Sequence, residues 1–471
     1  MLDHVRTFAT LVAAVMAFAS CATAEPSSAP VGARLEAAAQ AAFDREGTAG
    51  LAVGVYCGDD VLLERGWGVA DAGAAARVTP QTVFHVGSIT KPFTGLAINQ
   101  LIAAGVLSPG DTVGRLLAGY VGPARDVTVA QLLTHTAGVP EYVTPEVVVD
   151  FSPYTRERAL GLFKDRPLVF APGSRWMYSN SDTYLLGLII EAVSGLSYPD
   201  YVQQRIAAPF GLRHTWFAGR TPATEPVAAG YFRTPNGPVV APEYDPLLPF
   251  SAGSLLSTIG DLHRFVRAAY GPPGVAKVAP GVRQALLAPV RLPDGEAVFY
   301  RLGSVAVLDM AGHTKVGHAG LTAGFTSYFA YYPDDDLTIV VLSNATGVAP
   351  HPAHLEAELA RIALGLPAPV IADRPTGAQA ARDFAGDYAM VPYSFFGTDV
   401  FGLSAREDGL YFQFGPADPK APAIRLLRQD GDAFVSAADS EHVFRFRRDA
   451  SGQVTGFDLS FYGMPFRGQR Q

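Results

Sequence analysis

The sequence predicts an α+β fold: an antiparallel sheet flanked by helices, with a helical subdomain, followed by a small all-β domain. The first observation is the order of the expected elements, which runs from strands through many helices to strands and a final helix. The second is a change of pattern after residue 380, where short alternating segments replace the helical ones. With 471 residues, 49% of them hydrophobic, the chain is long enough for a large core and more than one domain.

The first 24 residues are predicted to be an export signal. Arg6 and the chain amine supply positive charge, and residues 7–19 form a mostly apolar stretch that is too short to span a bilayer. The small residues up to Ala24 fit a cleavage site. Cys21 lies in a segment that resembles a lipoprotein box, so lipid attachment there is the alternative to cleavage. We therefore predict an exported protein, periplasmic or secreted, and no later segment is expected to span a membrane.

Residues 31–365 are predicted to form the main domain. A Gly-Asp-Asp turn separates two apolar runs within 51–69, and an acidic turn separates two more within 325–342, so each segment is predicted to be a β-hairpin. Loops are expected over 205–250, which is rich in Pro and Gly. Helical spacing of apolar residues occurs in four segments, at 35–45, from Ser88 to about 104, at 182–194 and at 354–364.

The C-terminal part of the chain is predicted to be a separate unit. Residues 366–380 contain several Pro and Gly residues and are expected to be a linker. Residues 381–471 alternate short apolar runs with turns such as the one at 430–432, which indicates a small β-barrel-like domain. This last segment offers no pairing of a nucleophile with a base, so the chemistry is expected upstream.

The overall charge restricts the class of partner. A net charge of −8 and a pI near 5.7, without any run of Lys and Arg, argue against nucleic acid. The chain contains neither His-Glu-x-x-His nor a cluster of Cys and His, so we predict no metal and no other cofactor. The expected partner is a small-molecule or peptide substrate. The sequence gives no indication of the oligomeric state.

Ser88 and Lys91 form the first candidate catalytic pair. Polar residues around Ser88 lead into an apolar periodic stretch that ends at Gly105, which predicts a helix beginning near Ser88. Positions i and i+3 share one helix face, so the two side chains should be neighbours. A desolvated lysine can take the proton of a serine hydroxyl and thereby activate it. Taken alone, the spacing is more typical of a capping serine and a solvated lysine.

Two further segments accompany this pair. One is Tyr178-Ser179-Asn180, and the other is His-Ala-Gly-Leu-Thr-Ala-Gly-Phe-Thr-Ser-Tyr at 318–328. In order and spacing the three resemble the serine β-lactamase and penicillin-binding protein superfamily, which carries S-x-x-K, then S-D-N or Y-x-N, then K-T-G. The Tyr-Ser-Asn segment and the Leu-Leu-Thr-His-Thr-Ala-Gly at 132–138 are similar to the class C β-lactamase and D-alanyl-D-alanine carboxypeptidase branch. The resemblance covers roughly residues 35–365.

The resemblance implies a covalent mechanism. Ser88 would attack a carbonyl and form an acyl-enzyme, with Lys91 and Tyr178 moving the proton. The surroundings of Tyr178 are expected to lower its pKa, and the resemblance leaves open which of the two is the general base. Asn180 would orient Lys91 and a substrate carbonyl, the alternative being a simple turn residue. The backbone N–H groups of Ser88 and Leu321 would form the oxyanion hole.

The third motif departs from the family pattern. His318-Ala319-Gly320 stands where K-T-G is usual, and Gly320 fits a strand that substrate backbone approaches closely. Lys315-Val-Gly is a second possible match to K-T-G. We reject it because only the alignment that begins at His318 also matches the glycines and the phenylalanine at 320–325. A histidine is largely neutral at pH 7, so the grip on a substrate carboxylate should be weaker than with lysine. Related esterases, D-aminopeptidases and some carboxypeptidases also show His-x-Gly, and a buried histidine bonded to backbone is the alternative.

The sequence therefore predicts an exported serine hydrolase that acts through a Ser88 acyl-enzyme. Its substrate would be an ester or a small amide or peptide, D-amino-acid compounds included. Within the family, the alternatives are a D-alanyl-D-alanine carboxypeptidase and a β-lactamase. The alternative from another class is a non-hydrolytic sensor that binds cell-wall peptide. Substrate is expected between the helical subdomain and the strand at His318, with the loops at 140–160 and 205–250 shaping the site.

Overall fold

A computed structural model describes the chain from residue 30 onward. The residues outside the description are 1–29, 235, 347–350, 391–392 and 395–399. The predicted signal peptide, with the cleavage position after Ala24 and the lipid-anchor position at Cys21, lies outside the described residues. In the described ranges, no helix has both the length and the apolar character needed to cross a membrane.

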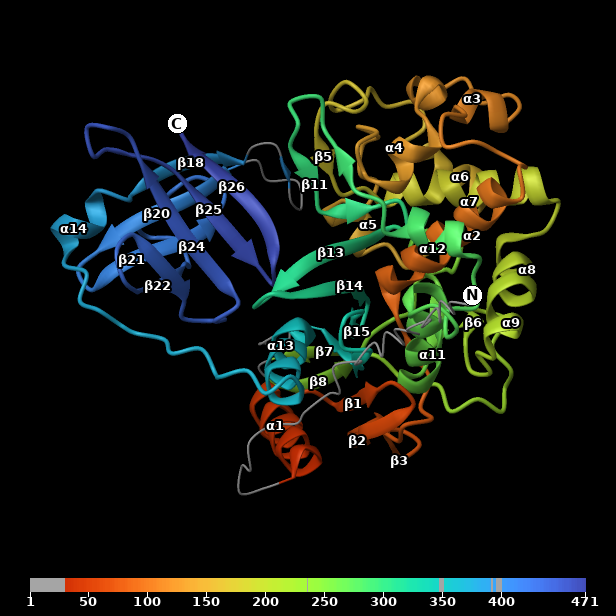
Figure 1. Cartoon of the computed structure of the whole chain (residues 1–471), viewed down its shortest axis with the longest axis horizontal. Helices are drawn as coiled ribbons and strands as arrows, with labels where there is room; N and C mark the ends of the chain where they lie inside the picture. Colours follow the sequence, from red (N-terminus) through yellow and green to blue (C-terminus); the bar gives the residue numbers. More distant parts are fainter. Residues whose placement is uncertain (1–29, 235, 347–350, 391–392, 395–399) are drawn as a thin grey trace, which may run out of the picture.

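The described residues form a helix-and-sheet body joined to a β-barrel by an extended segment (Figure 1). The body contains an antiparallel sheet whose eight described strands run in the order β12-β13-β14-β15-β16-β1-β2-β3. These strands are β1 (Gly50–Cys57), β2 (Asp60–Asp71), β3 (Ala76–Arg77), β12 (Tyr300–Arg301), β13 (Val305–Met310), β14 (His313–Thr322), β15 (Phe325–Tyr332) and β16 (Leu337–Ser343). Both predicted hairpins are present, as β1–β2 and β15–β16. The start and the end of the body meet because β1 pairs with β16, from Leu51 opposite Ser343 onward.

Helices cover both faces of this sheet. Neighbouring residues of a strand point to opposite faces, and β16 shows this: Ile339 and Val341 pack in the cluster under two helices, whereas Val340 and Leu342 pack on the other side. The two helices on the first face are α1 (Val31–Glu46) and α13 (Pro352–Ala363). The second face is covered by α2 (Thr90–Ala103), α11 (Ile259–Tyr270) and the helical subdomain. The α+β class predicted from the sequence is confirmed.

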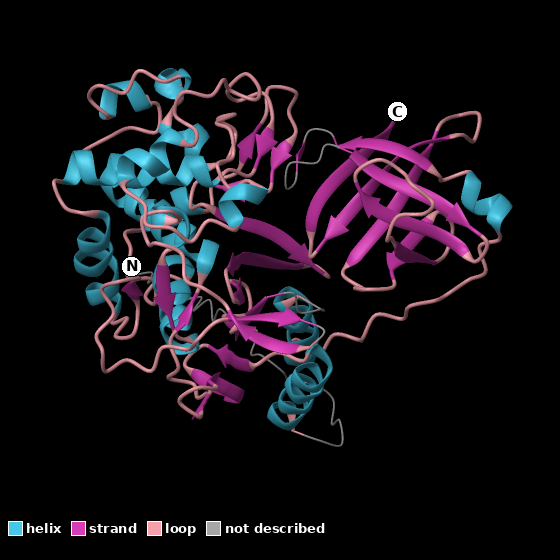
Figure 2. Ribbon diagram, turned by 180° about the vertical axis from the view of Figure 1, so that it is seen from behind, coloured by secondary structure: helices cyan, strands magenta, loops and turns pink. Residues whose placement is uncertain are grey.

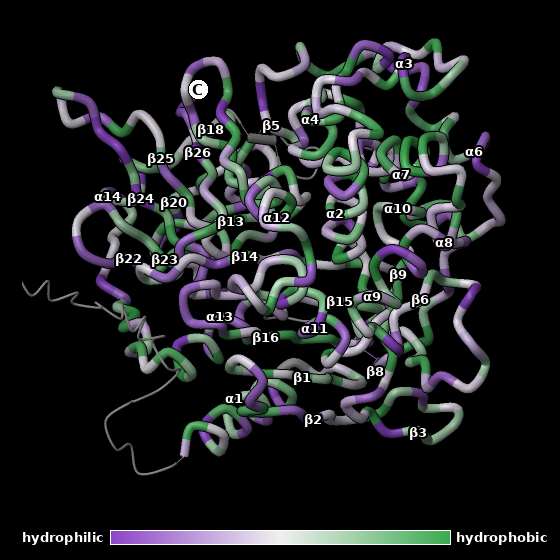
Figure 3. The backbone as a smooth tube through the Cα atoms, turned by 45° about the vertical axis from the view of Figure 1, so that its right-hand side comes forward, coloured by the Kyte–Doolittle hydropathy of each residue, from purple (hydrophilic) through white to green (hydrophobic). Residues whose placement is uncertain are grey.

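The helical subdomain is built around α7 and lies beside α2. Hydrophobic residues gather along these two helices at the centre of the body (Figure 3), and both helices are largely buried. The remaining helices are η1 (Gly87–Ile89), α3 (Val113–Leu116), η2 (Pro123–Asp126), α4 (Val129–Leu133), α5 (Pro145–Val148), α6 (Arg156–Gly161), α7 (Asn180–Ser194), α8 (Tyr198–Val202), η3 (Gln203–Ala207), α9 (Ala208–Phe210), α10 (Phe250–Gly253) and α12 (Pro280–Leu286).

Short strands tie the loops of the body together. They are β4 (Phe84–His85), β5 (Trp176–Met177), β6 (Trp216–Phe217), β7 (Tyr231–Thr234), β8 (Gly237–Val240), β9 (Leu255–Ser257), β10 (Val290–Arg291), β11 (Ala297–Val298) and β17 (Ala345–Thr346). One further short strand, β19 (Tyr393–Ser394), comes from the C-terminal segment and pairs with β5. The expectation of loops alone over 205–250 is wrong, because β6 pairs with β9 and β7 pairs with both β8 and β17. The partners β9 and β17 are distant in sequence and leave no local pattern, whereas β7 and β8 form a local hairpin within the segment rich in Pro and Gly.

The C-terminal unit is a closed antiparallel barrel, confirming the predicted all-β class. Its described strands are β18 (Gly386–Met390), β20 (Val400–Arg406), β21 (Gly409–Phe414), β22 (Ile424–Arg428), β23 (Ala433–Ser436), β24 (His442–Arg448), β25 (Val454–Phe461) and β26 (Met464–Arg470). Figure 2 shows these strands curving around one another, with α14 (Ala378–Arg382) beside the barrel. The domain boundaries given above, at 31–365, 366–380 and 381–471, stay predictions.

The C-terminal unit contacts the body at several places, among them the pairing of β19 with β5. Near α13, His354 Nδ1 and Asp439 Oδ1 are 2.8 Å apart. Near β11, the rings of Phe299 and Phe466 have centroids 6.3 Å apart, and Arg467 forms an ion pair of 3.2 Å with Glu296. The aromatic core of the barrel is therefore continuous with the part of the body that carries β5 and β12.

Candidate active site

Ser88 and Lys91 meet at the junction of η1 and α2. Lys91 Nζ donates a hydrogen bond of 3.0 Å to Ser88 Oγ, and Ser88 itself stays partly exposed. Lys91 is fully buried, and burial lowers its pKa to about 7. At this pKa about half of the Lys91 side chains are neutral near pH 7. The neutral amine has two N–H donors, so it can keep its bonds to Asn180 and Ala252 and turn its lone pair to the serine proton. The structure thus brings together the pair expected from the sequence.

Two glycines allow β14 to lie against the turn that carries Ser88. Gly87 has a φ of +52°, and a Cβ at this position would lie 2.8 Å from the backbone nitrogen of Leu321. A Cβ at Gly320 would lie only 2.0 Å from the carbonyl oxygen of Val86. Any side chain at either glycine would push the strand away. The close contact puts the backbone at Leu321 beside the Ser88 turn, as an oxyanion hole made by these two residues requires.

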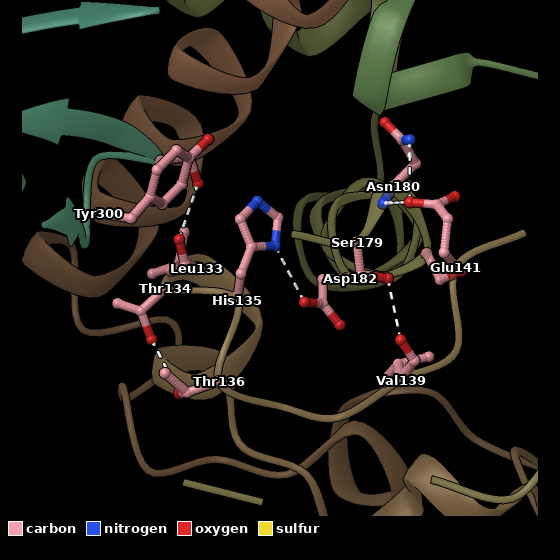
Figure 4. A network of polar contacts seen from close by, with 12 residues as sticks. Leu133, Thr134, His135, Thr136, Val139, Glu141, Ser179, Asn180, Asp182 and Tyr300 are labelled. Atoms are coloured by element: carbon pink, nitrogen blue, oxygen red, sulfur yellow. Dashed lines mark hydrogen bonds and ion pairs between the residues drawn. The ribbon is translucent and has the colours of Figure 1, made fainter. Parts of the chain in front are cut away.

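Asn180 begins α7 and is a direct partner of Lys91. Its Oδ1 accepts a hydrogen bond of 2.6 Å from Lys91 Nζ, which also donates to the carbonyl oxygen of Ala252 at 2.9 Å. Glu141 lies on the other side of the Asn180 amide (Figure 4). Asn180 is therefore more than a turn residue, and Glu141 is a member of the site that the sequence did not indicate.

Tyr178 follows β5 and lies over the catalytic pair. Its hydroxyl group hydrogen-bonds the side chain of Ser88, and Lys91 Nζ lies 4.8 Å from the centre of its ring. Burial raises the pKa of Tyr178 far above the usual phenol value, although the bond to Ser88 opposes this. The expectation of a lowered pKa is therefore wrong. Tyr178 is therefore a neutral phenol in this site.

His318 is buried on β14 with both ring nitrogens in contact with protein. Nδ1 is 2.6 Å from the carbonyl oxygen of Ala319, and Nε2 is 2.7 Å from the hydroxyl of Tyr300. The carbonyl can only accept, so Nδ1 carries the proton and Nε2 accepts from Tyr300. Burial and the nearby Lys91 lower the pKa of His318 to about 3. The ring is neutral at working pH. Lys315, in the rejected register, pairs instead with Glu356 at 2.9 Å.

The family model described as Beta-lactamase matches residues 33–363, which hold all of the side chains described so far in this site. The chain belongs to the β-lactamase family. The family and its structural neighbours of the amidase and penicillin-binding types are serine hydrolases, and this chain is one as well. The resemblance seen in the sequence is confirmed.

Individual relatives agree with this assignment. Penicillin-binding protein 4* of Bacillus subtilis (strain 168) is 29% identical over 309 residues, which are 61% of this chain and 66%, just under two thirds, of that protein. The octameric penicillin-binding protein homologue from Pyrococcus abyssi has the same fold, with a TM-score of 0.66 at 24% identity over 93% of this chain and 99% of that one. A D-stereospecific amidohydrolase from Streptomyces sp. has a TM-score of 0.59 at 25% identity, over 71% of this chain and 98% of that one.

A buried pair of polar side chains lies near Tyr178 in this β-lactamase-family chain, and the sequence did not predict it. His135 Nδ1 lies 3.0 Å from Asp182 Oδ2, and both side chains are buried (Figure 4). The His135 ring is 4.8 Å from the rings of Tyr178 and Tyr300, measured between centroids. Burial lowers the pKa of His135 well below its usual value, so it is a neutral packing partner. The segment that contains His135, residues 132–138, was singled out in the sequence only because it is similar to the family pattern. Across the described ranges, no group of His, Cys, Asp or Glu is placed to hold a metal ion.

The contact between barrel and body leads to a first prediction. Phe466 of the barrel packs on Phe299, whose neighbour Tyr300 holds His318. Phe466→Leu should let Tyr300 shift and lower kcat/KM for an ester by about tenfold. Loss of buried aromatic volume should cost about 1–3 kcal/mol of stability. Kinetics and thermal melting check both effects.

The control for this prediction is Phe414→Leu, at a half-exposed barrel position. It should leave kcat/KM unchanged. If Phe466→Leu lowers the melting temperature but keeps the wild-type kcat/KM, the barrel only stabilises the protein and does not shape the site.

Proposed function

We propose that this chain is an exported serine hydrolase that forms an acyl-enzyme on Ser88 with neutral esters or small amides and peptides. The observation that supports it most is the hydrogen bond of 3.0 Å between Lys91 Nζ and Ser88 Oγ. Burial, which lowers the pKa of Lys91 to about 7, also supports the proposal. Export, to the periplasm or beyond, rests on the N-terminal sequence alone.

In acylation, Ser88 Oγ forms a bond to the substrate carbonyl carbon while neutral Lys91 takes the hydroxyl proton. The backbone N–H groups of Ser88 and Leu321 stabilise the negative oxygen of the tetrahedral intermediate. Tyr178, a neutral phenol bonded to Ser88, gives its proton to the leaving alkoxide or amine and regains one from Lys91. The carbon–leaving-group bond breaks, and the acyl-enzyme remains.

Deacylation repeats these steps with water. Lys91 takes a proton from the water as its oxygen attacks the acyl carbon. The bond between that carbon and Ser88 Oγ then breaks, the proton passes to Oγ, and the carboxylic acid leaves. Asn180 keeps Lys91 directed at the serine through the bond of 2.6 Å. The non-hydrolytic sensor is disfavoured because a nucleophile, a base and a proton donor are all in contact.

The substrate class follows from His318. Both of its ring nitrogens are engaged, and its pKa of about 3 leaves it uncharged, so it supplies neither a cation nor a free donor for a carboxylate. Substrates without a carboxylate next to β14 should therefore be preferred. The likeness to a D-stereospecific amidohydrolase supports the inclusion of D-amino-acid amides. A D-alanyl-D-alanine carboxypeptidase or a β-lactamase, whose substrates carry a carboxylate, fits less well.

The test compares two esters that differ only in a carboxylate on the acyl side, together with a penicillin. The wild type should hydrolyse the neutral ester fastest, and His318→Lys should shift the kcat/KM ratio toward the carboxylate ester by about tenfold. The reason is that a charge-assisted bond contributes about 1.5–3 kcal/mol. Initial rates at one pH measure the ratio.

The matched control for this prediction is His313→Lys, at a position on β14 whose ring bonds Asp335 on the surface turn. It should leave the ratio as in the wild type. A wild type that prefers the carboxylate ester or the penicillin would contradict the proposed substrate class.

A further inference from the structure

Glu141 lies on the segment that passes the N-terminal end of α7. Its Oε2 accepts two hydrogen bonds from Asn180, one from the backbone nitrogen at 2.7 Å and one from Nδ2 at 3.0 Å. Its Oε1 accepts from the backbone nitrogen of Val143 at 2.7 Å. Figure 4 shows the carboxylate facing the amide of Asn180. Both oxygens of this carboxylate therefore have defined partners, which hold the side chain in one orientation.

These bonds fix the direction of the Asn180 amide. Its Nδ2 can only donate and its Oδ1 can only accept. With Nδ2 directed at Glu141, Oδ1 is directed at Lys91 Nζ, at 2.6 Å. A reversed amide would put oxygen against carboxylate and NH₂ against the lysine, so both contacts would be lost. Glu141 thus determines which end of Asn180 the lysine meets.

We propose that Glu141 is a positioning residue of this active site, which locks the Asn180 amide and so holds Lys91 against Ser88. This inference rests on the proposed function, because it assigns Glu141 a part in the same reaction. In the described structure Glu141 makes no hydrogen bond to Ser88; it holds Asn180 and adds its charge to the surroundings of Lys91.

The charge of Glu141 also reaches Lys91. Burial lowers the pKa of Lys91, while Glu141 and Asp182 raise it, with the result of about 7. The other titratable groups that face Lys91 are Tyr178, whose ring lies 4.8 Å away, and the neutral His135 and His318. Burial also raises the pKa of the Glu141 and Asp182 carboxyls, and the bonds from Asn180 and Val143 oppose this at Glu141. Replacing Glu141 by glutamine removes its upward effect on the pKa of Lys91. The pKa of Lys91 should then fall below 7.

The test is the pH dependence of kcat and KM for a neutral ester, in the wild type and in Glu141→Gln. Wild-type kcat/KM should rise with pH through about 7 as Lys91 loses its proton. Glutamine removes the charge and replaces one accepting oxygen by an NH₂ group, so the acceptors for Asn180 and for the Val143 backbone nitrogen cannot both be kept. Because the charge is lost, the rise of kcat/KM should move to lower pH. Because Lys91 is held less firmly, kcat should fall about tenfold while KM changes little.

Two variants separate positioning from folding. Glu141→Asp keeps the charge and should keep the rise near pH 7, even where its shorter side chain lowers kcat. Glu146→Gln changes an exposed glutamate further along the same segment and should match the wild type at every pH. Thermal melting confirms that each variant is folded.

The outcomes are distinct. A Glu141→Gln profile that superimposes on the wild type overturns the inference. The inference is also overturned if Glu141→Gln and Glu141→Asp lose kcat equally and the pH at which kcat/KM rises does not change. Such a result would be a structural effect. A wild type that forms no adduct on Ser88 with an activated ester would instead overturn the proposed function itself.

Discussion

Replacing Ser88 by alanine is expected to lower kcat/KM for a neutral ester by about 1,000-fold or more, because the acyl-enzyme needs the serine oxygen. What remains should come from binding and the oxyanion hole. Folding should be intact, since the hydrogen bonds of the Ser88 hydroxyl among the described residues are to the site groups Lys91 and Tyr178. Initial rates and thermal melting measure the two effects.

The matched control for Ser88→Ala is Ser174→Ala, on an exposed loop before β5. It should retain wild-type kinetics. If Ser88→Ala retains more than about a tenth of the wild-type kcat/KM, a nucleophile other than Ser88 carries the reaction.

Replacing Lys91 by methionine should have an effect of similar size, a loss of about 1,000-fold in kcat/KM, because the base that activates Ser88 disappears. Methionine fills much of the buried volume without a charge. The wild type should gain activity as the pH rises through about 7, the pKa to which burial lowers Lys91. This rise should be absent from the residual activity of the variant, which a profile from pH 5 to 9 measures.

Lys164→Met changes a half-exposed lysine on the helical subdomain and is the control for this second prediction. Its profile should overlay that of the wild type. A Lys91→Met variant that keeps the rise near pH 7 would mean that another group is the base, and would contradict the role given to Lys91.

The sequence predicted those parts of the site whose geometry is local or carried by a motif. The contact between Ser88 and Lys91 follows from a spacing of three residues on a helix. Tyr178, Asn180 and His318 were found because each lies in a short motif at the expected place. In the fold, β1–β2 and β15–β16 were predictable because each hairpin is local in sequence.

The residues that escaped prediction act through contacts across the chain. Glu141 bonds Asn180 from 39 positions away, and Tyr300 reaches His318 from a separate strand. No spacing rule connects such residues. The pKa of Tyr178 was expected in the wrong direction because its burial among aromatic rings is a property of packing, not of its motif.

The most direct test of the central claim is to locate the acyl group. The wild type is mixed with an activated short-chain ester, quenched within a turnover, and examined by intact mass and peptide mapping. We expect a mass increase of one acyl group on the peptide that contains Ser88, and none in Ser88→Ala. Steady turnover of the ester with no adduct at any quench time, or an adduct on a different residue, would contradict the acyl-enzyme on Ser88.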